Sequence, residues 1–478
     1  MTLKQKTITG LLWSSIERFS FQGLQFIITI IMARILNPSD FGLIGMIAVF
    51  VAISQSLIDS GFAAALIQKK DRNQTDLSTI FFFNLVVSIF FYFLIFFSSP
   101  YIADFYKEPK LIILTKVISI NIIFLSLTLI QTTLYTIKLN FKTQAKASLI
   151  SLIISGFIGI YLAYSGYGVW SLVWQTLIKN ALNCILLWLY SKWIPDLMFS
   201  RKSFSSLFSY GSNLLLAGLL YTIFENIYLF IIGKNFNSKE LGYYVKARNV
   251  ANLPSASISG IILRVTFPVL SSIQDNHEKL ISGYNKIIRF TMFVTFPLII
   301  LLAVESEPMI SLLLTDKWEP ATIYLKLLCF VLIWYPINEI NINLIKVKAL
   351  TYSILKLSIL RIIITVTLLI ITLPFGIKML VVGQIIASFL IFLVINLFTC
   401  NKFHINIMKQ LKDITHFIIV LMVIAYLTNL LNLLEIDNLL KLLLETIIFL
   451  GLYSLYSYFF FKSEIMEIVT IAKKILNL

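Results

Sequence analysis

Cysteine, histidine and long polar stretches are scarce in this sequence, and each scarcity excludes a class of function. The 478 residues include 3 Cys and 3 His, whose spacing matches no metal-ligand pattern. The G-x-x-x-x-G-K-S/T phosphate-binding loop is absent, so we expect no ATP hydrolysis by that route. No polar stretch is long enough to form a soluble catalytic domain. We therefore expect no metal, no cofactor, no catalytic residues and no enzymatic activity.

Apolar residues, by contrast, make up 58% of the chain, and the mean hydropathy is +0.89. They gather in segments of roughly 20 residues, the length that crosses the hydrocarbon core of a bilayer. Because lipid offers no hydrogen-bond partners, each backbone N–H and C=O must be satisfied within its own segment, which a helix achieves. The sequence predicts an all-α membrane protein with about 14 transmembrane helices. The predicted ranges are 10–36, 41–66, 77–97, 111–135, 147–163, 169–190, 204–232, 241–267, 287–304, 321–345, 354–373, 379–398, 417–431 and 439–461.

The 39 basic residues outnumber the 23 acidic ones, which gives a formal net charge of +16. They concentrate in the N-terminus, in every second loop and in the C-terminus, for example at Lys4, Lys69 and Lys473. Basic loops stay in the cytoplasm, so we expect both termini to be cytoplasmic. The basic excess therefore predicts membrane orientation and contact with anionic lipids, and no nucleic-acid partner.

A repeat occurs at an offset of 200 residues, where 34–42 aligns with 234–242. Both copies place Asn, an acidic residue and Gly at matching positions between two predicted helices. The offset spans six helices, as expected for a duplicated six-helix half in which both copies keep one orientation. We expect an N-terminal half over 1–200, a C-terminal half over 201–400, and helices 13 and 14 in 401–478.

Charged and polar side chains interrupt several of these apolar segments. A charge at the bilayer centre costs roughly 2.5–3.5 kcal/mol on insertion scales, so such residues tend to face a hydrated interior. On the first helix, Arg18, Gln22 and Gln25 recur every three or four residues and share one face. We expect helices 1, 2, 7 and 8 to line a central cavity. Its candidate residues are Arg18, Gln22, Gln25, Asp59, Glu225, Lys246, Arg248, Asn252 and Arg264.

Two interpretations of these charges stay open. Arginine suits phosphate because its planar guanidinium donates two parallel hydrogen bonds, so cavity arginines would bind an anionic head group. Alternatively, the charges neutralise one another across dry helix contacts, for example Asp59 with Arg18. Buried acids such as Glu225 and Glu339 would relay protons, so H+ or Na+ is the expected coupling ion. Lys179, in the predicted sixth helix, has no assigned role.

The stretch 33–43, followed by 57–62 and 65–68, resembles the opening of the polysaccharide-exporting lipid flippases of the Wzx (WzxC/TuaB-like) type. The segment 312–320 is also similar to that family, which lies in the multidrug/oligosaccharidyl-lipid/polysaccharide exporter superfamily. The resemblance implies a protein of the bacterial cytoplasmic membrane, in which two six-helix halves open alternately to each side. Its cargo would be an undecaprenyl-diphosphate-linked oligosaccharide, moved to the outer leaflet for the synthesis of O-antigen, capsule or exopolysaccharide.

The resemblance also implies roles for individual residues. Related lipid II flippases hold the diphosphate with arginines on helices 1, 2 and 8, and Arg18 and Arg264 are the matching positions here. Helix 2 departs from this pattern, because it carries Asp59 and no arginine. Helices 13 and 14 would cradle the lipid tail. The implied partners are the lipid-linked oligosaccharide, membrane lipids, a glycan polymerase and chain-length proteins.

Two alternative functions stay open. A cation-coupled multidrug exporter on the same scaffold would have an acidic, aromatic cavity, whereas the charges within these segments include more cations than acids. A membrane glycan polymerase would carry a large outer loop, and this sequence has none. Both features favour the flippase.

Overall fold

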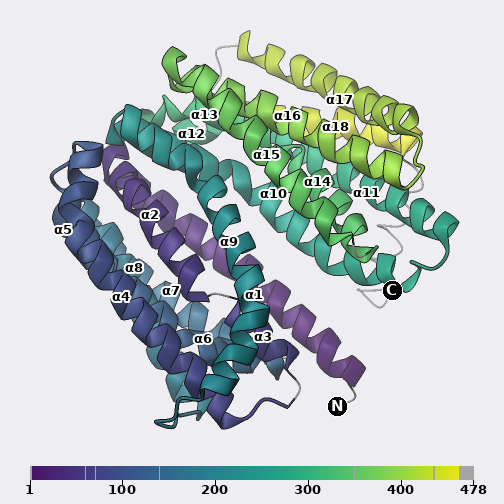
Figure 1. Ribbon diagram of the computed structural model, residues 1–478. Helices are drawn as coiled ribbons and strands as arrows, with labels where there is room; N and C mark the ends of the chain where they lie inside the picture. The colour runs from purple at the N-terminus through teal and green to yellow at the C-terminus, as the bar shows by residue number, and fades with distance from the viewer. Residues whose placement is uncertain are drawn as a thin grey trace. The chain divides into compact units, whose positions relative to one another are not determined.

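The computed structural model describes residues 3–59, 61–69, 71–138, 140–348, 350–433 and 437–461, and every regular element in them is a helix (Figure 1). This confirms the all-α fold class. Within these residues, 11 helical stretches are long and apolar enough to cross a membrane. Three further helices are also long, α1 (Leu3–Ile35), α9 (Arg201–Asn235) and α10 (Ser238–Ser272). The count of about 14 spans therefore stays a prediction.

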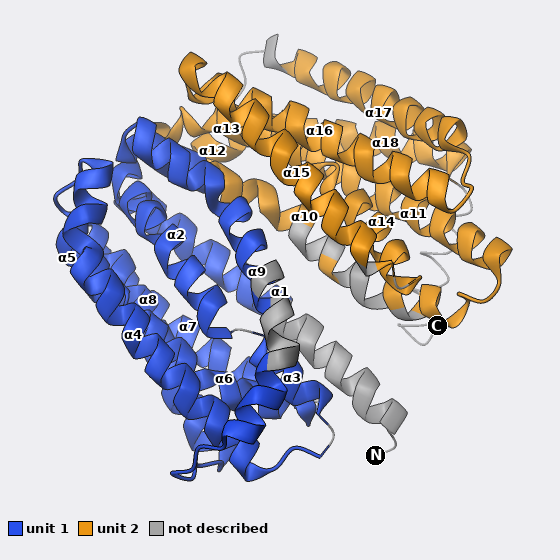
Figure 2. Ribbon diagram, viewed as in Figure 1, with its two compact units in different colours: residues 1–245 blue, residues 246–478 orange. Residues whose placement is uncertain are grey.

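The chain forms two compact units, Met1–Val245 and Lys246–Leu478 (Figure 2). The first unit holds α1, α9, the first turns of α10, and α2 (Pro38–Asp59), α3 (Phe62–Gln68), α4 (Gln74–Tyr106), α5 (Leu111–Ile118), α6 (Asn121–Ile137), α7 (Phe141–Tyr164) and α8 (Val169–Ser191). The second holds the rest of α10 with α11 (His277–Val304), α12 (Ser306–Leu314), α13 (Ala321–Leu332), α14 (Tyr335–Val347), α15 (Thr351–Thr372), α16 (Ile377–Lys402), α17 (Ile407–Asn429) and α18 (Asn438–Phe460). The predicted halves, 1–200 and 201–400, follow the sequence repeat and stay a prediction.

Three of the predicted spans are each divided into two helices. Gly61, with a positive φ of 70°, separates α2 from α3. In the span of α13 and α14, Pro336 has no N–H to donate to the carbonyl of Leu332, one turn earlier. The hydroxyl of Ser255 on α10 donates to that freed carbonyl at 3.4 Å. A proline inside a span is tolerated when a neighbouring side chain satisfies the backbone in this way.

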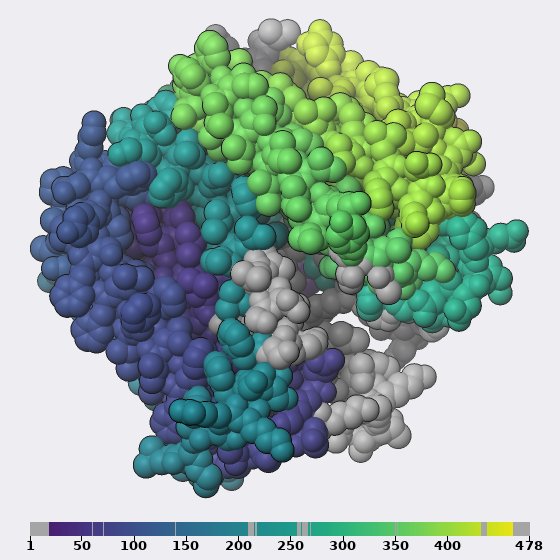
Figure 3. All heavy atoms as spheres, in the orientation of Figure 1, coloured from purple at the N-terminus to yellow at the C-terminus, as the bar shows by residue number. Residues whose placement is uncertain are grey.

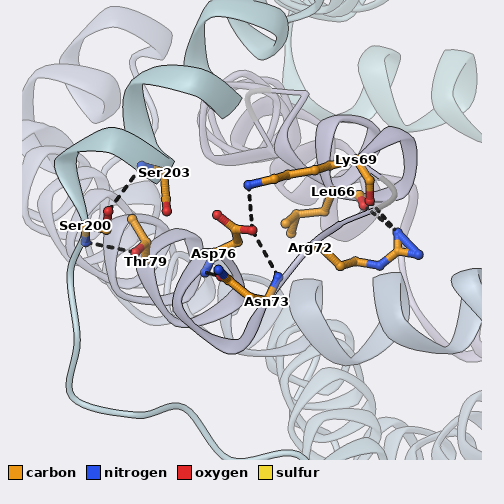
Figure 4. Close-up of polar contacts among 8 residues, drawn as sticks. All are labelled: Leu66, Lys69, Arg72, Asn73, Asp76, Thr79, Ser200 and Ser203. Atoms are coloured by element: carbon orange, nitrogen blue, oxygen red, sulfur yellow. Dashed lines mark hydrogen bonds and ion pairs between the residues drawn. The ribbon is translucent and has the colours of Figure 1, made fainter.

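Polar contacts at the start of α4 fix the connection between α8 and α9 (Figure 4). Asn73 and Asp76 form a capping box, in which each side chain accepts a hydrogen bond from the other residue's backbone N–H. Asp76 also pairs with Lys69 at 2.7 Å. The N–H of Ser200, which caps α9, donates to the hydroxyl of Thr79 on α4 at 3.1 Å. These contacts anchor α9 in the first unit, where it packs on α2, α3 and α4.

The two turns of the sequence repeat lie against each other within the first unit. A Cβ added at Gly42 would overlap the backbone carbonyl of Ser238, and one added at Gly242 would overlap that of Pro38. Pro38 and Ser238 occupy matching positions in the two turns, 200 residues apart, as do Gly42 and Gly242. The glycine of each turn therefore lies against the matching residue of the other turn. A reciprocal contact of this kind is what a two-fold relation between the turns produces. Only glycine lets the two backbones approach so closely.

Helix α15 lies on the face of the second unit that Figure 3 shows, and most of its exposed residues are apolar. Exposed residues there include Tyr352, Leu355 and Ile363. A surface of this composition suits contact with lipid.

The interior of the same unit is held by a polar network. The hydroxyl of Tyr284 donates to Asn341 and accepts from Gln410 (3.3 Å), and Asn341 donates to Asn396 at 3.4 Å. These contacts link α11, α14, α16 and α17, since buried polar groups in a membrane protein stabilise helix pairs when they satisfy one another.

Candidate functional site

The polar face of α1 belongs to the first unit, where the helix packs on α7. Ile28 fits against Gly156 of α7. Beside this contact, Gln25 and Gln22 are half-buried. The amide of Gln25 donates to the hydroxyl of Thr29 at 3.2 Å, while its side-chain oxygen, Oε1, is buried and accepts no hydrogen bond from the described residues. That oxygen could accept a hydrogen bond from a ligand hydroxyl or N–H.

Lys179 extends from α8 toward α1. Its ammonium nitrogen lies 6.0 Å from the centre of the Phe21 ring, and the side chain is half-buried. Phe21 neighbours Gln22 and lies one turn before Gln25, so the lysine approaches the polar region of α1. A cation inside a membrane span is a functional candidate by default. The sequence marked Lys179 as a charge within an apolar segment, but only the fold identifies its neighbour.

The two predicted cavity acids of the first unit occupy different environments. Asp59 is the last residue of α2 and is exposed, directly before the break at Gly61. Glu225 is half-buried on α9, and next to it Asn226 donates to the carbonyl of Thr222 at 2.8 Å on its own helix. Because α2 packs on α9, both acids belong to helices that touch. Asn226 is satisfied locally, and the acids keep their predicted role as cavity candidates.

The predicted cations of α10 that the structure describes lie in the second unit. Lys246 is 2% exposed, and its ammonium lies 5.6 Å from the ring of Trp318, which is itself fully buried. A cation over an aromatic face is stabilised by the ring's electron density. Arg248 and Asn252 follow on α10 and are half-buried. Burial under Trp318 gives Lys246 a structural role, and its role as a ligand stays a prediction.

Arg18 and Arg264, to which the resemblance assigned the diphosphate, lie on α1 and α10 but outside the residues whose side chains are described. Their roles stay predictions. Among the described residues, no group of three or more His, Cys, Asp or Glu side chains could hold a metal ion.

A pocket of about 550 Å³ occupies the second unit between α11, α17 and α18. Three basic residues, Lys286, Arg289 and Lys409, and one acid, Asp413, line it, and its wall is aromatic, with Phe417 and Tyr456. The basic side chains are exposed. Exposed basic side chains beside an aromatic wall suit the phosphate head group of an anionic lipid. The family resemblance implied that the last two helices cradle the lipid tail, and nothing in the sequence indicated this pocket.

Comparison with known proteins places the chain among proteins of polysaccharide synthesis. The family described as "Polysaccharide biosynthesis protein" matches residues 31–323. The chain is 26% identical over 334 residues to the teichuronic acid biosynthesis protein TuaB of Bacillus subtilis, which covers 69% of each chain. It is 27% identical over 334 residues to the lipopolysaccharide biosynthesis protein WzxC of Escherichia coli, covering 69% of this chain and 68% of that one.

Among solved structures, the chain is similar to the lipid II flippase MurJ in an inward closed conformation. That likeness has a TM-score of 0.76 and 16% identity, and covers 94% of this chain and 99% of the other. An outward-facing multidrug resistance MATE family transporter of the MOP superfamily gives a TM-score of 0.53 at 16% identity, covering 83% and 95%. At such low identity these likenesses show a shared fold.

Proposed function

This chain belongs to the polysaccharide biosynthesis protein family, and from that premise we propose that it is a flippase for lipid-linked oligosaccharides. It would carry these units across the bacterial cytoplasmic membrane, with both termini in the cytoplasm, for the synthesis of a surface polysaccharide. The family match over residues 31–323 is the observation that carries the proposal. The fold shared with a lipid II flippase supports it, since that protein also moves a lipid-linked glycan.

The cargo we propose is an undecaprenyl-diphosphate-linked oligosaccharide. Arg18 and Arg264 would hold the diphosphate through paired hydrogen bonds, and Lys179 would add a point charge beside α1. Amide side chains such as Gln25 and Asn252 would contact the sugar hydroxyls. The halves would then alternate access between the two leaflets, driven by a gradient of H+ or Na+.

A transport assay tests the function directly. Purified protein in vesicles should move a fluorescent lipid-linked oligosaccharide between leaflets while leaving a fluorescent phosphatidylcholine in place. Failure to move any lipid-linked oligosaccharide offered, by protein that is folded, would reject the flippase. Export of a cationic drug instead would support the multidrug alternative, and lengthening of the glycan would support a polymerase.

Variants of the two arginines test the assigned site. Arg18→Ala and Arg264→Ala should each lower transport by about 10- to 100-fold, because each removes hydrogen bonds to a charged group. Arg18→Lys and Arg264→Lys should keep part of the activity, since they retain the charge without the planar fork. Normal transport by both alanine variants, at wild-type protein levels, would remove these residues from the site.

A further inference from the structure

Two buried carboxyl groups meet where α11 ends and α12 begins, against α18. Glu305 follows the last residue of α11 and is 5% exposed. Glu445 lies two turns into α18 and is fully buried. Helix α12, which begins directly after Glu305, packs against α18, which contains Glu445, within the second unit. The polysaccharide family match ends at residue 323, so α18 lies beyond it.

The hydrogen bonds around this pair are incomplete. The hydroxyl of Thr446 donates to Glu305 Oε1 at 3.0 Å. The other oxygen of Glu305 and both oxygens of Glu445 accept no hydrogen bond from the described residues. The two carboxyl groups nevertheless lie within hydrogen-bond reach of each other. Two carboxylates have only acceptors, but a carboxylic acid can donate to a carboxylate.

The charges buried around the pair also favour the binding of one proton. Lys441, one turn before Glu445 on α18, is 8% exposed and is close enough to attract both acids. Glu307 on α12 is exposed and repels Glu445. With both carboxyl groups ionised, the buried groups carry two negative charges and one positive charge. One added proton makes the buried set neutral, and an uncompensated buried charge is costly.

The titration of Glu305 agrees with this geometry. Burial, together with the neighbouring Glu445, raises the pKa of Glu305 from its ordinary value of 4.5 to about 7, against the opposing effects of Thr446 and Lys441. The Glu305 carboxyl group would therefore gain or lose its proton near neutral pH.

We propose that Glu305 and Glu445 form a binding site for one proton, held between the two carboxyl groups, with Glu305 as donor and Glu445 as acceptor. The bound proton joins the start of α12 to α18, and its loss places two buried carboxylates against each other. The site does not depend on the identity of the cargo. It gives the last helix pair a docking contact that responds to pH.

Infrared difference spectroscopy of the full-length protein, titrated in detergent, detects the proton directly. The wild type should show the carbonyl band of a buried carboxylic acid that disappears as the pH rises. Glu305→Gln and Glu445→Gln should each lose this band, and Glu307→Gln, an exposed acid two residues from Glu305, should retain it. A titrating band that survives in both buried variants, or the absence of one in the wild type, would overturn the proposal.

Thermal unfolding against pH gives a second measurement. The folded protein keeps the proton up to about pH 7, whereas unfolded Glu305 loses it near 4.5, so this contribution to stability is complete below 4.5 and is lost as the pH rises through 7. The melting temperature should fall across this window in the wild type and in Glu307→Gln. It should fall less in Glu445→Gln and Glu305→Gln, because the amide donates a hydrogen bond at any pH.

Two outcomes of the unfolding measurement would contradict a proton site. The first is a wild-type slope that both glutamine variants retain in full. The second is a rise in melting temperature on adding Na+ at constant pH and ionic strength that both variants abolish, which would make the ligand a sodium ion.

Discussion

The helices around α1 and α2 in the first unit and those around Tyr284 in the second are held by different kinds of contact. Around α1 and α2 glycines form the contacts: Gly42 lies against a backbone carbonyl, and Gly156 lies against Ile28. In this region Gln25 keeps a buried oxygen that accepts no hydrogen bond from the described residues, and Lys179 faces an aromatic ring. The closest contacts between these helices are therefore made at glycines.

Around Tyr284 in the second unit, polar side chains make contacts between helices. Tyr284, Asn341 and Gln410 bond to one another across α11, α14 and α17. A polar residue in a membrane span is thus a structural link where the facing helix offers a polar partner. Beside α1, where the facing residues are glycine, aliphatic or aromatic, we expect half-buried polar side chains such as Gln25 and Lys179 to be available to a ligand. Four predictions break or sharpen this distinction.

Gly42→Ala should have the largest effect. The added methyl group would overlap the Ser238 carbonyl, and a backbone atom yields less readily than a side chain. We expect a loss of about 3 kcal/mol in the stability of this contact, the upper part of the usual range for overpacking. Both the melting temperature and the rate of transport should fall. Gly23→Ala on α1 is the control, because nothing lies within 4 Å of its added carbon. Equal behaviour of the two variants would show that the glycine contact is not a structural joint.

Lys179→Ala should lower transport by about 10- to 100-fold and leave the melting temperature unchanged, because the lysine is assigned to a ligand. Lys116→Ala is a matched control: Lys116 is also half-buried in a span of the first unit, with its ammonium 4.6 Å from the ring of Phe96. That control should transport normally. Loss of stability without a selective loss of transport would place Lys179 among the structural links.

Asn341→Leu should produce the opposite pattern in the second unit. The hydroxyl of Tyr284 would lose its acceptor in a buried site, which costs about 1–2 kcal/mol, so the melting temperature should fall. Transport per folded molecule should stay near the wild-type value. Adding Tyr284→Phe removes the stranded hydroxyl and should recover part of the loss. A strong transport defect in a stable Asn341→Leu protein would contradict the structural role.

Periodicity and composition predicted the helical class and the positions of the helices well, because a bilayer imposes the same length and polarity on every span. The break at Gly61 and the division at Pro336 were missed, since one depends on the backbone conformation of a single glycine and the other on a single proline, and hydropathy averages out both. The repeat at an offset of 200 did indicate the turns containing Gly42 and Gly242, which meet in the structure.

The candidate site was less accessible to sequence reasoning. A charge within a span is visible in the sequence, but its partner comes from another helix far along the chain. Lys246 was placed in the cavity set, and only the fold brings Trp318 over it. The pair of Glu305 and Glu445 is 140 residues apart in sequence, and no spacing pattern connects the two acids. Helical periodicity predicts which residues share one face of a helix, but the partner of that face depends on tertiary packing.

The smallest effect concerns two exposed lysines that line the pocket of the second unit, Lys286 and Lys409. Lys286→Gln and Lys409→Gln should each weaken the stabilisation given by phosphatidylglycerol, by up to about 1 kcal/mol, because each removes one charge near an anionic surface. The measurement is the gain in melting temperature on adding phosphatidylglycerol compared with phosphatidylcholine. Lys412→Gln is the control, since Lys412 is exposed on α17 but does not line the pocket. If all three variants lose the gain equally, the effect belongs to the basic surface in general; if none does, the lipid binds elsewhere.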